Sequence, residues 1–321
     1  MNSAAIHQQT HQQMKALRAH ARGGPEQLRY EDAPVPEEPT GSEVCVAVRA
    51  AAITFDELTW PETWESNGVD RTPIIPSHEV SGVVVAVGPE VQGFVPSDEV
   101  FGLVPFNRNG AAAEYVLVAA ADLTRKPDGV SHVMAAAAVL PALTASEALV
   151  HARLTAGQQL LVRGASGAVG SFVTQFAARM GVEVTGTVRS SGSTDRIKRL
   201  GAQDVLVGDE PAGLAPGVFD AAIDAAGAGT PDWAYRAVRP GGRVITLQEP
   251  PDAQMATAAG VDAMFFVVDP GPEDLQRLAG QLAAGGIEVP IARTVPLAEG
   301  ATAYASRGRT NAPGKIVLTV P

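Results

Sequence analysis

Short apolar stretches separated by glycine and proline mark the first part of the chain. Between residues 14 and 133, most apolar runs have the length of a strand, and proline stands near many of their ends. Glycine and proline favour turns, so this part is expected to form a compact, mostly β domain. The expected strands are Glu43–Ala50, Val80–Val87, Glu99–Leu103 and Ala113–Val118.

The pattern changes near Ser131, where longer segments begin to alternate with short apolar runs. This alternation predicts a doubly wound parallel sheet over residues 134–285. The expected helices are His132–Leu140, Thr144–Ala152, Ala168–Met180, Asp195–Leu200, Trp233–Val238 and Glu273–Ala284. The expected strands are Gln159–Arg163, Glu183–Val188, Asp204–Val207, Ala221–Asp224, Arg243–Leu247 and Ala263–Val268. Residues 286–321 return to β character and are expected to complete the first domain.

A glycine-rich turn stands between one of these strands and the helix that follows it. Gly164, Gly167 and Gly170 let the backbone approach a ligand closely. The next helix presents free N–H groups and the positive end of its dipole to the same place. The turn therefore predicts a seat for a pyrophosphate group.

The amino-acid composition limits which partners the protein can bind and where in the cell it is expected. The formal net charge of −11 argues against a general nucleic-acid or anionic-membrane binder, since phosphate contacts require lysine and arginine. No apolar run approaches the roughly 18 residues that span a membrane, so a cytoplasmic protein is expected. The polar residues 1–13 are expected to form a disordered tail. The single cysteine, Cys45, excludes an intrachain disulfide.

Several motifs together resemble the medium-chain dehydrogenase/reductase superfamily, in its zinc-free branch of quinone oxidoreductase-like proteins. The segments that carry the resemblance are Ile75–Gly82, Leu140–Ala145, Val162–Gly170 and Gly314–Leu318. The resemblance implies an α/β protein with a GroES-like β domain and a Rossmann domain with a doubly wound parallel sheet. The β domain would comprise residues 14–133 and 286–321, and the Rossmann domain residues 134–285.

The resemblance also bears on zinc. The zinc-dependent branch uses a cysteine, a histidine and a further cysteine or acidic ligand. Here the histidine is His78, but the first cysteine position falls near Thr54 and the later one near Leu140 and Pro141. These residues cannot replace thiolates at a tetrahedral zinc, so no catalytic metal is expected. His78 is then either a buried residue bonded to nearby backbone groups, or a donor to the substrate.

The end of the second Rossmann strand points to NADPH. NAD-specific folds place a carboxylate there, whereas this chain has Val188 followed by Arg189 and Ser190, which suit a 2′-phosphate. Arg189 can also be read as a solvated loop residue. For Lys315, cofactor and packing roles are both open. The resemblance implies further cofactor contacts at Thr144, Gly164, Ser166, Gly167, Ala168, Val169, Gly170, Ala226, Leu247 and Lys315.

The segment from Ala52 to Trp60 aligns with the family region beside the nicotinamide, although Thr54 replaces an asparagine there. Thr54 and His78 are the candidate catalytic residues. The enoyl-thioester reductases of the superfamily carry a tyrosine proton donor just after this segment, where this chain has tryptophans instead. The expected substrate pocket comprises Phe55, Trp60, Trp64 and Asn107, which suit a flat apolar molecule.

Together these features predict an NADPH-dependent reductase of quinones or α,β-unsaturated carbonyls. Two other readings stay open: a biosynthetic tailoring enzyme with a non-redox reaction, such as cyclisation or dehydration, and a binding protein on the same fold. A homodimer is expected, because the apolar run Ala263–Val268 would be hazardous as a bare sheet edge.

Overall fold

The computed structural model describes residues 13–211, 214–307 and 312–321. The expected tail therefore lies outside the described residues, apart from Gln13, which begins the first strand. The chain divides into two compact units, which are described separately below. Unit 1 comprises Met1–Leu140, Pro270–Gly286 and Ile291–Pro321, and unit 2 comprises Pro141–Asp269 and Ile287–Pro290.

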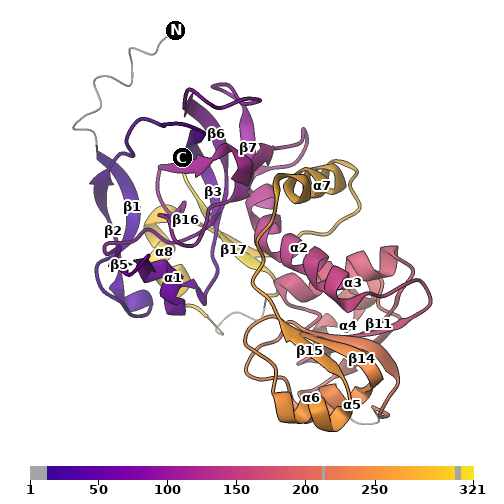
Figure 1. The fold of residues 1–321 in the computed structure, drawn as a ribbon. Coiled ribbons are helices and arrows are strands. Elements are labelled where there is room, and N and C mark those ends of the chain that lie inside the picture. The colour runs from indigo at the N-terminus through magenta and orange to yellow at the C-terminus, as the bar shows by residue number, and fades with distance from the viewer. Residues whose placement is uncertain (1–12, 212–213, 308–311) are drawn as a thin grey trace. The chain divides into compact units, whose positions relative to one another are not determined.

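Unit 1 is built on a seven-stranded sheet (Figure 1). Its strand order is β16-β17-β3-β6-β7-β9, and β8 also pairs with β3. These strands are β3 (Glu43–Ala52), β6 (Glu79–Val87), β7 (Glu99–Leu103), β8 (Tyr115–Ala119), β9 (Leu123–Arg125), β16 (Ile291–Pro296) and β17 (Lys315–Thr319). Two small antiparallel pairs accompany it: β1 (Gln13–Ala19) with β2 (Leu28–Pro34), and β4 (Glu65–Ser66) with β5 (Val69–Asp70).

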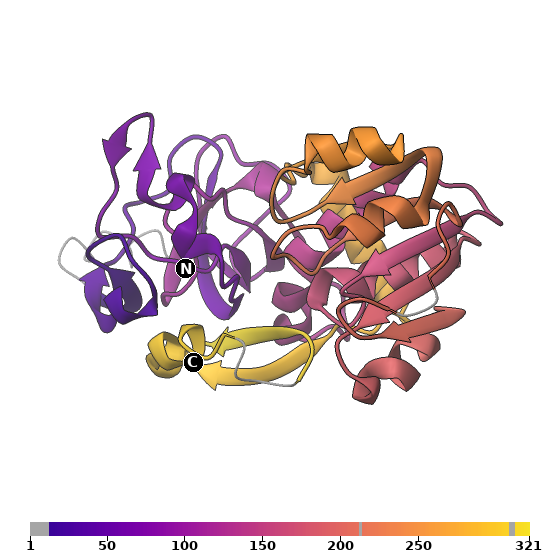
Figure 2. The same cartoon turned by 90° about the horizontal axis from the view of Figure 1, so that it is seen from below.

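The end of the chain completes this sheet. β17 pairs antiparallel with β3, and β16 runs parallel to β17. Helix α8 (Gly300–Tyr304) lies in the connection between β16 and β17, and Figure 2 shows this segment in yellow. The last segment, which was expected to complete the first domain, thus contributes a strand next to β3.

Unit 2 contains a six-stranded sheet in which every pairing is parallel. Its order is β12-β11-β10-β13-β14-β15, so the direction of winding reverses between β10 and β13. Ligands of doubly wound folds bind at such a reversal, outside the carboxyl ends of the strands. The strands are β10 (Gln159–Arg163), β11 (Glu183–Val188), β12 (Asp204–Val207), β13 (Phe219–Asp224), β14 (Val238–Thr246) and β15 (Asp262–Phe265).

The helices of unit 2 alternate with these strands, which confirms the predicted doubly wound α/β fold. They are α3 (Ala168–Arg179), α4 (Thr194–Arg199), α5 (Asp232–Ala237) and α6 (Ala253–Ala259). Unit 1 holds the short helix α1 (Pro61–Trp64) and the longer α7 (Pro272–Ala283). Short 3₁₀ helices are Pro25–Gln27, Glu57–Thr59, Ala120–Asp122, Ser191–Ser193 and Leu297–Glu299.

Helix α2 (His132–Ala152) differs from the prediction of two helices. Pro141, which was expected near the start of the second helix, lies inside one continuous helix. Proline removes a single backbone donor, and the buried alanines on both sides keep the helix packed. By length and composition α2 could cross a membrane, but 61% of its apolar window is buried inside the protein, as in the core helix of a folded domain.

The boundaries of the units also differ from those expected. α2 passes from unit 1 into unit 2 after Leu140, whereas the sequence suggested a change at residue 134. α7 groups with unit 1 because it packs against β9, although residues 134–285 were expected to form one domain. β15 ends at Phe265, three residues before the end of the predicted strand.

Candidate active site

A buried ion pair lies where three strands of unit 1 meet. Lys315 begins β17, and its Nζ is 2.5 Å from Oε1 of Glu79, the first residue of β6. The same Nζ donates to Oγ1 of Thr54 at 2.8 Å, and the Thr54 hydroxyl donates to Glu79 at 3.2 Å. Burial raises the pKa of the Glu79 carboxyl, and the charge of Lys315 opposes this effect.

These contacts limit Thr54 as a catalytic group. A threonine hydroxyl has one hydrogen to donate, and that of Thr54 is directed to Glu79. Thr54 can donate to a substrate only if it gives up this bond. Lys315, for which cofactor and packing roles were both open, forms an ion pair with Glu79 and a hydrogen bond with Thr54 in unit 1.

A second buried carboxylate, that of Glu57, lies in the same unit. Glu57 is fully buried, and its Oε2 accepts a hydrogen bond from the backbone N–H of Ser77 at 3.0 Å. Its Oε1 accepts a short hydrogen bond from the hydroxyl of Tyr304, which ends α8. The hydroxyls of Ser77 and Tyr304 lie 2.9 Å apart. Burial is the largest effect on this carboxyl, and it raises the pKa of Glu57 to about 7.

His78 stands beside this carboxylate. It is 2% exposed, and its Nε2 is 3.6 Å from Oε2 of Glu57, longer than a hydrogen bond. Its other ring nitrogen, Nδ1, is buried and has no hydrogen-bond partner among the described residues. Burial and the nearby charge of Arg71 lower the pKa of His78 to about 3, against the opposing effect of backbone contacts with Val104 and Pro105, so the ring is neutral at physiological pH.

Aromatic rings extend from His78 toward the surface of unit 1. The ring centroids of His78 and Phe106 are 5.0 Å apart, and those of Phe106 and Trp60 are 4.9 Å apart, both at steep angles. Phe106 and Trp60 are half-buried, so part of each ring can meet a ligand. Edge-to-face contacts of this kind hold the rings in fixed orientations.

The other predicted pocket residues differ in exposure. Phe55 is half-buried against the core of unit 1, and Asn107 is exposed. The assignment of Trp64 to the pocket is contradicted by the structure. Trp64 is 3% exposed within the hydrophobic core, and its indole N–H donates to the carbonyl of Leu58 at 2.9 Å. Trp64 therefore fills the core instead of lining a pocket.

The described residues at the expected zinc position do not fit a zinc ion. Thr54 holds the place of a first ligand, but its hydroxyl lies 2.8 Å from the ammonium of Lys315, whose charge repels a cation. Among residues 13–211, 214–307 and 312–321, no group of three histidine, cysteine, aspartate or glutamate side chains could hold a metal. The donor set thus lacks the three protein ligands of a catalytic zinc.

In unit 2, the glycine turn has the geometry of an anion seat. Gly164 has a φ of +76°, and a Cβ at Gly170 would come within 2.2 Å of the Gly164 carbonyl oxygen. α3 begins directly after Gly167, at the carboxyl end of β10, with Ser166, Ala168 and Val169 half-buried around it. The first amides of a helix have no partner within the helix, so they face any bound anion.

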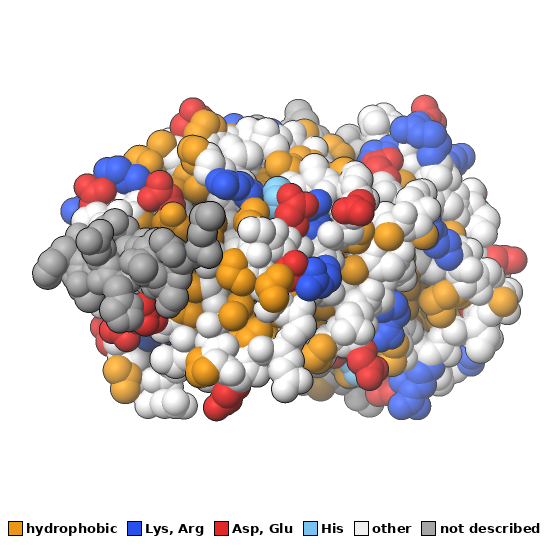
Figure 3. Space-filling model, turned by 90° about the horizontal axis from the view of Figure 1, so that it is seen from above, with side chains coloured by type: hydrophobic (Ala, Val, Ile, Leu, Met, Phe, Trp, Pro, Cys, Tyr) orange, Lys and Arg blue, Asp and Glu red, His pale blue; other side chains and the backbone are white. Residues whose placement is uncertain are grey.

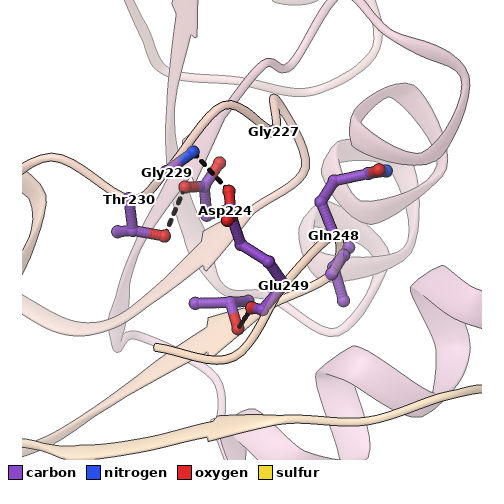
Figure 4. A pocket seen from close by; sticks show the side chains of 8 residues that line it. Asp224, Gly227, Gly229, Thr230, Gln248 and Glu249 are labelled. Atoms are coloured by element: carbon purple, nitrogen blue, oxygen red, sulfur yellow. Dashed lines mark hydrogen bonds between the residues drawn. The ribbon is translucent and has the colours of Figure 1, made fainter. Parts of the chain in front are cut away.

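A network of hydrogen bonds holds the loop after β13 beside this turn. Arg163, the last residue of β10, donates to Asp224 at 2.8 Å and to the carbonyls of Gly227 and Gly229 at 3.2 and 2.8 Å. Thr230 donates to the same carboxyl at 2.6 Å. Figure 4 shows Asp224 and Thr230 converging in this loop.

Asp224, Gly227, Gly229 and Thr230 line a small pocket at the carboxyl ends of β13 and β14. The N–H of Gly229 donates to Glu249 at 2.5 Å, which joins the loops after the two strands (Figure 4). Leu247, a predicted cofactor contact, lines the pocket. Ala226, a second predicted cofactor contact, is exposed. Its backbone lies close to Gly164, since a Cβ placed on Gly164 would be only 3.0 Å from the Cα of Ala226. Thr144 is half-buried in the part of α2 that belongs to unit 2.

At the end of β11, Arg189 and Ser190 are both exposed. Arg196 is the other arginine near this strand end, and it is already engaged. Its guanidinium contacts Oε1 of Glu288 at 2.5 Å and donates to the hydroxyl of Ser171. Of these two arginines near the end of β11, Arg189 is therefore the one whose exposed guanidinium is available to bind an anion.

Sequence reasoning missed Tyr304, Ser77 and Arg163. The hydroxyl of Tyr304 reaches Glu57 across 247 positions of the chain, and no local pattern predicts such a pair. Ser77 had a weak signal, since it directly precedes His78, but its φ of +66° is seen only in the structure. Arg163 precedes the glycine turn, and its charge in an otherwise apolar strand was a signal for a polar partner.

Two segments of the chain match models of known protein families. A model of the alcohol dehydrogenase GroES-like domain matches residues 40–128, and one of the zinc-binding dehydrogenases matches residues 200–318. A mitochondrial NAD(P)H oxidoreductase of mouse is 30% identical over 287 residues, which cover 78% of this chain and 72% of the relative. The chain belongs to the medium-chain dehydrogenase/reductase superfamily.

Other members of the superfamily agree with the fold described above. The 2-methylene-furan-3-one reductase of tomato is 33% identical over 260 residues, covering 77% of this chain and 63% of the relative. A mycobacterial structure solved with NADPH has a TM-score of 0.82 at 28% identity and covers 96% of this chain and all of its own. The quinone oxidoreductase of Coxiella burnetii has a TM-score of 0.87 at 24% identity, covers 97% of this chain and all of its own, and shows the shared fold. As a member of this superfamily, the chain is an oxidoreductase.

Proposed function

We propose that the protein is an NADPH-dependent, zinc-independent reductase of a quinone or an α,β-unsaturated carbonyl compound. The observation that carries this proposal is the glycine turn Gly164–Gly170, placed where the parallel sheet of unit 2 reverses its winding. The names of relatives support it, since they include an NAD(P)H oxidoreductase, a furanone reductase and a quinone oxidoreductase.

The turn would hold the pyrophosphate of the cofactor. The backbone amides of Ala168, Val169 and Gly170 and the hydroxyl of Ser166 are the donors available at the start of α3. The loops that contain Ala226 and Leu247, and the α2 residue Thr144, supply the remaining contacts of unit 2. Lys315 stays a candidate contact only through the resemblance. When bound, the nicotinamide supplies a hydride.

The end of β11 supports NADPH over NADH. Val188 offers no carboxylate to a ribose, and Arg189 and Ser190 are exposed directly after it. A guanidinium can bind a 2′-phosphate through two parallel hydrogen bonds. The absence of an acidic side chain at residue 188 also removes repulsion of the phosphate.

The groups of unit 1 support a carbonyl acceptor. Hydride added to the β-carbon of an enone leaves negative charge on the carbonyl oxygen, which then takes up a proton. With no fitting site for zinc, hydrogen-bond donors must stabilise that charge, and His78 and Thr54 are the candidates. The half-buried rings of Trp60, Phe106 and Phe55 suit a flat apolar substrate. Asn107 is exposed and would contact only a larger molecule.

We infer that the partners are a small molecule and a second copy of this chain. The net charge of −11 disfavours nucleic acid, and on the face in Figure 3 acidic and basic side chains are interspersed. β15, the last strand of the parallel sheet, carries the apolar side chains expected at a dimer edge. A cytoplasmic location stays a prediction from the sequence, and several relatives of this chain are mitochondrial.

The test measures oxidation of NADPH and NADH at 340 nm against a panel of quinones and aryl enones. We expect turnover with NADPH preferred. Arg189→Ala should raise the KM for NADPH about tenfold or more and leave that for NADH nearly unchanged, because one bidentate phosphate contact is lost. Arg199→Ala, an exposed arginine of α4, is the matched control and should match the wild type.

Three results would contradict parts of the proposal. An equal rise of both KM values in Arg189→Ala would remove this residue from the phosphate site. Tight binding of NADPH with no oxidation across the panel would favour a non-redox tailoring reaction. No binding of either nucleotide would overturn the assignment of the glycine turn.

A further inference from the structure

The carboxylate of Glu57 has no role in the function proposed above, although its burial is complete. Unit 1 holds two such buried carboxylates, and only Glu79 has a lysine partner, Lys315 at 2.5 Å. The side chain of His78 lies within 4 Å of the Glu57 carboxylate. Among the described residues, it is the basic group at this distance from Glu57. Burial without a permanently charged partner favours the protonated form of a carboxyl group.

The surroundings of Glu57 hold it in a fixed position. Ser77 adopts a φ of +66°, a conformation that residues other than glycine rarely take. This conformation lets one residue serve two partners, since its N–H donates to Glu57 and its hydroxyl contacts that of Tyr304. Tyr304 donates in turn to Glu57. Strain that is retained in a fully buried residue beside titratable groups is typical of functional sites.

His78 connects this carboxyl to a second, unused position. Its Nε2 faces Oε2 of Glu57 at 3.6 Å, and Nδ1 lies buried without a partner among the described residues. Catalytic hydrogen bonds are often this long before a ligand binds. Backbone groups of Val104 and Pro105 lie close enough to the His78 ring to raise its pKa, but Nδ1 makes no hydrogen bond of normal geometry among the described residues, so it is the end of the pair that a ligand can contact.

We propose that Glu57 and His78 form a proton relay, in which Glu57 stores the proton that the substrate takes up and His78 passes it on. This role rests on the proposed reduction, which consumes one hydride and one proton. The N–H bond at Nδ1 breaks as the substrate gains its proton, and the proton of Glu57 forms a new N–H bond at Nε2. His78 ends as the other neutral tautomer, Glu57 ends as a carboxylate, and solvent returns one proton.

The neighbouring charges agree with this exchange. Burial and the charge of Glu79 raise the pKa of Glu57, whereas the hydrogen bonds from Tyr304 and Ser77 and the charge of Lys315 lower it, with a result of about 7. Burial and Arg71 keep His78 neutral. Burial and Glu57 raise the pKa of Tyr304 well above its usual range, so its hydroxyl stays a donor.

The first test is nitrogen NMR of the full chain labelled in its imidazole rings. The signals of His78 are assigned by their loss in His78→Gln. We expect Nδ1 to carry the hydrogen at low pH and Nε2 to carry it at high pH, with the change centred near pH 7. Glu57→Gln should hold His78 in one tautomer throughout, and the exposed control Glu62→Gln should behave as the wild type. A wild-type ring that keeps one tautomer, or a Glu57→Gln ring that still changes, would overturn the relay.

The second test uses any acceptor that the wild type reduces. Glu57→Gln should lower kcat roughly 100-fold and change the Kd for NADPH less than twofold. Tyr304→Phe removes a hydrogen bond that lowers the pKa of Glu57, so the decline of kcat at high pH should move to higher pH. Unchanged kcat and pH profile in both variants would refute the relay. If the wild type reduces no acceptor, the proposed function fails, and the NMR result alone decides whether the pair exchanges a proton.

Discussion

The two buried glutamates of unit 1 show how one residue type acquires different properties at the residue scale. Glu79 accepts hydrogen bonds from Lys315, Thr54 and the N–H of Leu140, so its charge is matched by a cation. Glu57 receives hydrogen bonds from neutral donors only. Desolvation disfavours the charged form, and the more distant charge of Lys315 offsets it only in part, because no lysine or arginine is paired with Glu57 in the described structure.

This difference predicts how stability depends on pH. The pKa of Glu57 is raised from 4.5 to about 7 in the folded protein. Folding therefore favours the protonated carboxyl, and this contribution is complete below about pH 4.5 and is lost as the pH rises through 7. The loss amounts to roughly 3 kcal/mol at most, at 1.36 kcal/mol per pKa unit.

Urea unfolding between pH 5 and pH 8 measures this contribution. The free energy of unfolding of the wild type should fall relative to that of Glu57→Gln as the pH rises, because glutamine does not titrate. The exposed Glu62→Gln should follow the wild type at each pH. Parallel curves for the wild type and Glu57→Gln would show that Glu57 is not protonated in the folded protein.

At the scale of elements, the glycine turn makes a sharp prediction about binding. A Cβ at Gly170 would lie 2.2 Å from the carbonyl oxygen of Gly164, so alanine there must push the turn away from α3. Gly170→Ala should weaken NADPH binding at least tenfold, as followed by nucleotide fluorescence. Gly192→Ala is the matched control, since nothing lies within 4 Å of its Cβ. Equal affinity in the two variants would mean that the turn is not the pyrophosphate seat.

Elements with a clear local pattern were predictable from the sequence, and those fixed by distant contacts were not. The strand–turn–helix around Gly164 follows from its flanking segments, and the alternation of strands and helices predicted the parallel sheet. Pro141 suggested a break that the buried packing of α2 overrides. Trp64 was expected in the pocket because an aromatic ring suits a flat apolar substrate. Its indole N–H instead donates a hydrogen bond to the carbonyl of Leu58 inside the core.

The site of unit 1 was predictable only in part. His78 was singled out because it stands at the histidine position of the zinc-dependent branch of the family. The commitment of the Thr54 hydroxyl to Glu79 depends on strand pairing between β3, β6 and β17, which no short window of sequence contains. The contact between Tyr304 and Glu57 depends on the same pairing at longer range.

At the scale of the whole molecule, the edges of the parallel sheet predict how copies associate. β15 ends the sheet on one side and β12 on the other. Val267, just after β15, is 65% exposed, and Val207, the last residue of β12, is 46% exposed. Apolar edges of this kind favour pairing with a second chain.

Light scattering should therefore give about twice the 33.1 kDa mass of one chain. Val267→Lys places a charge at the β15 edge and should shift the mass to that of a single chain. Val207→Lys, at the opposite edge, should stay a dimer. A wild-type mass of 33.1 kDa would refute the dimer, and dissociation by Val207→Lys alone would place the interface at β12.

The pairing of β17 with β3 also sets the order in which the chain can acquire its structure during synthesis. β3 leaves the ribosome well before β17, which lies far downstream in the chain. All the strands of the parallel sheet are complete before β17 exists, so unit 2 can fold while unit 1 still lacks its closing strand. Until β17 is made, residues 50–52 of β3 stay without their partner strand, and the carboxylates of Glu57 and Glu79 stay without Tyr304 and Lys315. A nascent chain stalled before residue 300 would thus present an open apolar sheet edge to chaperones.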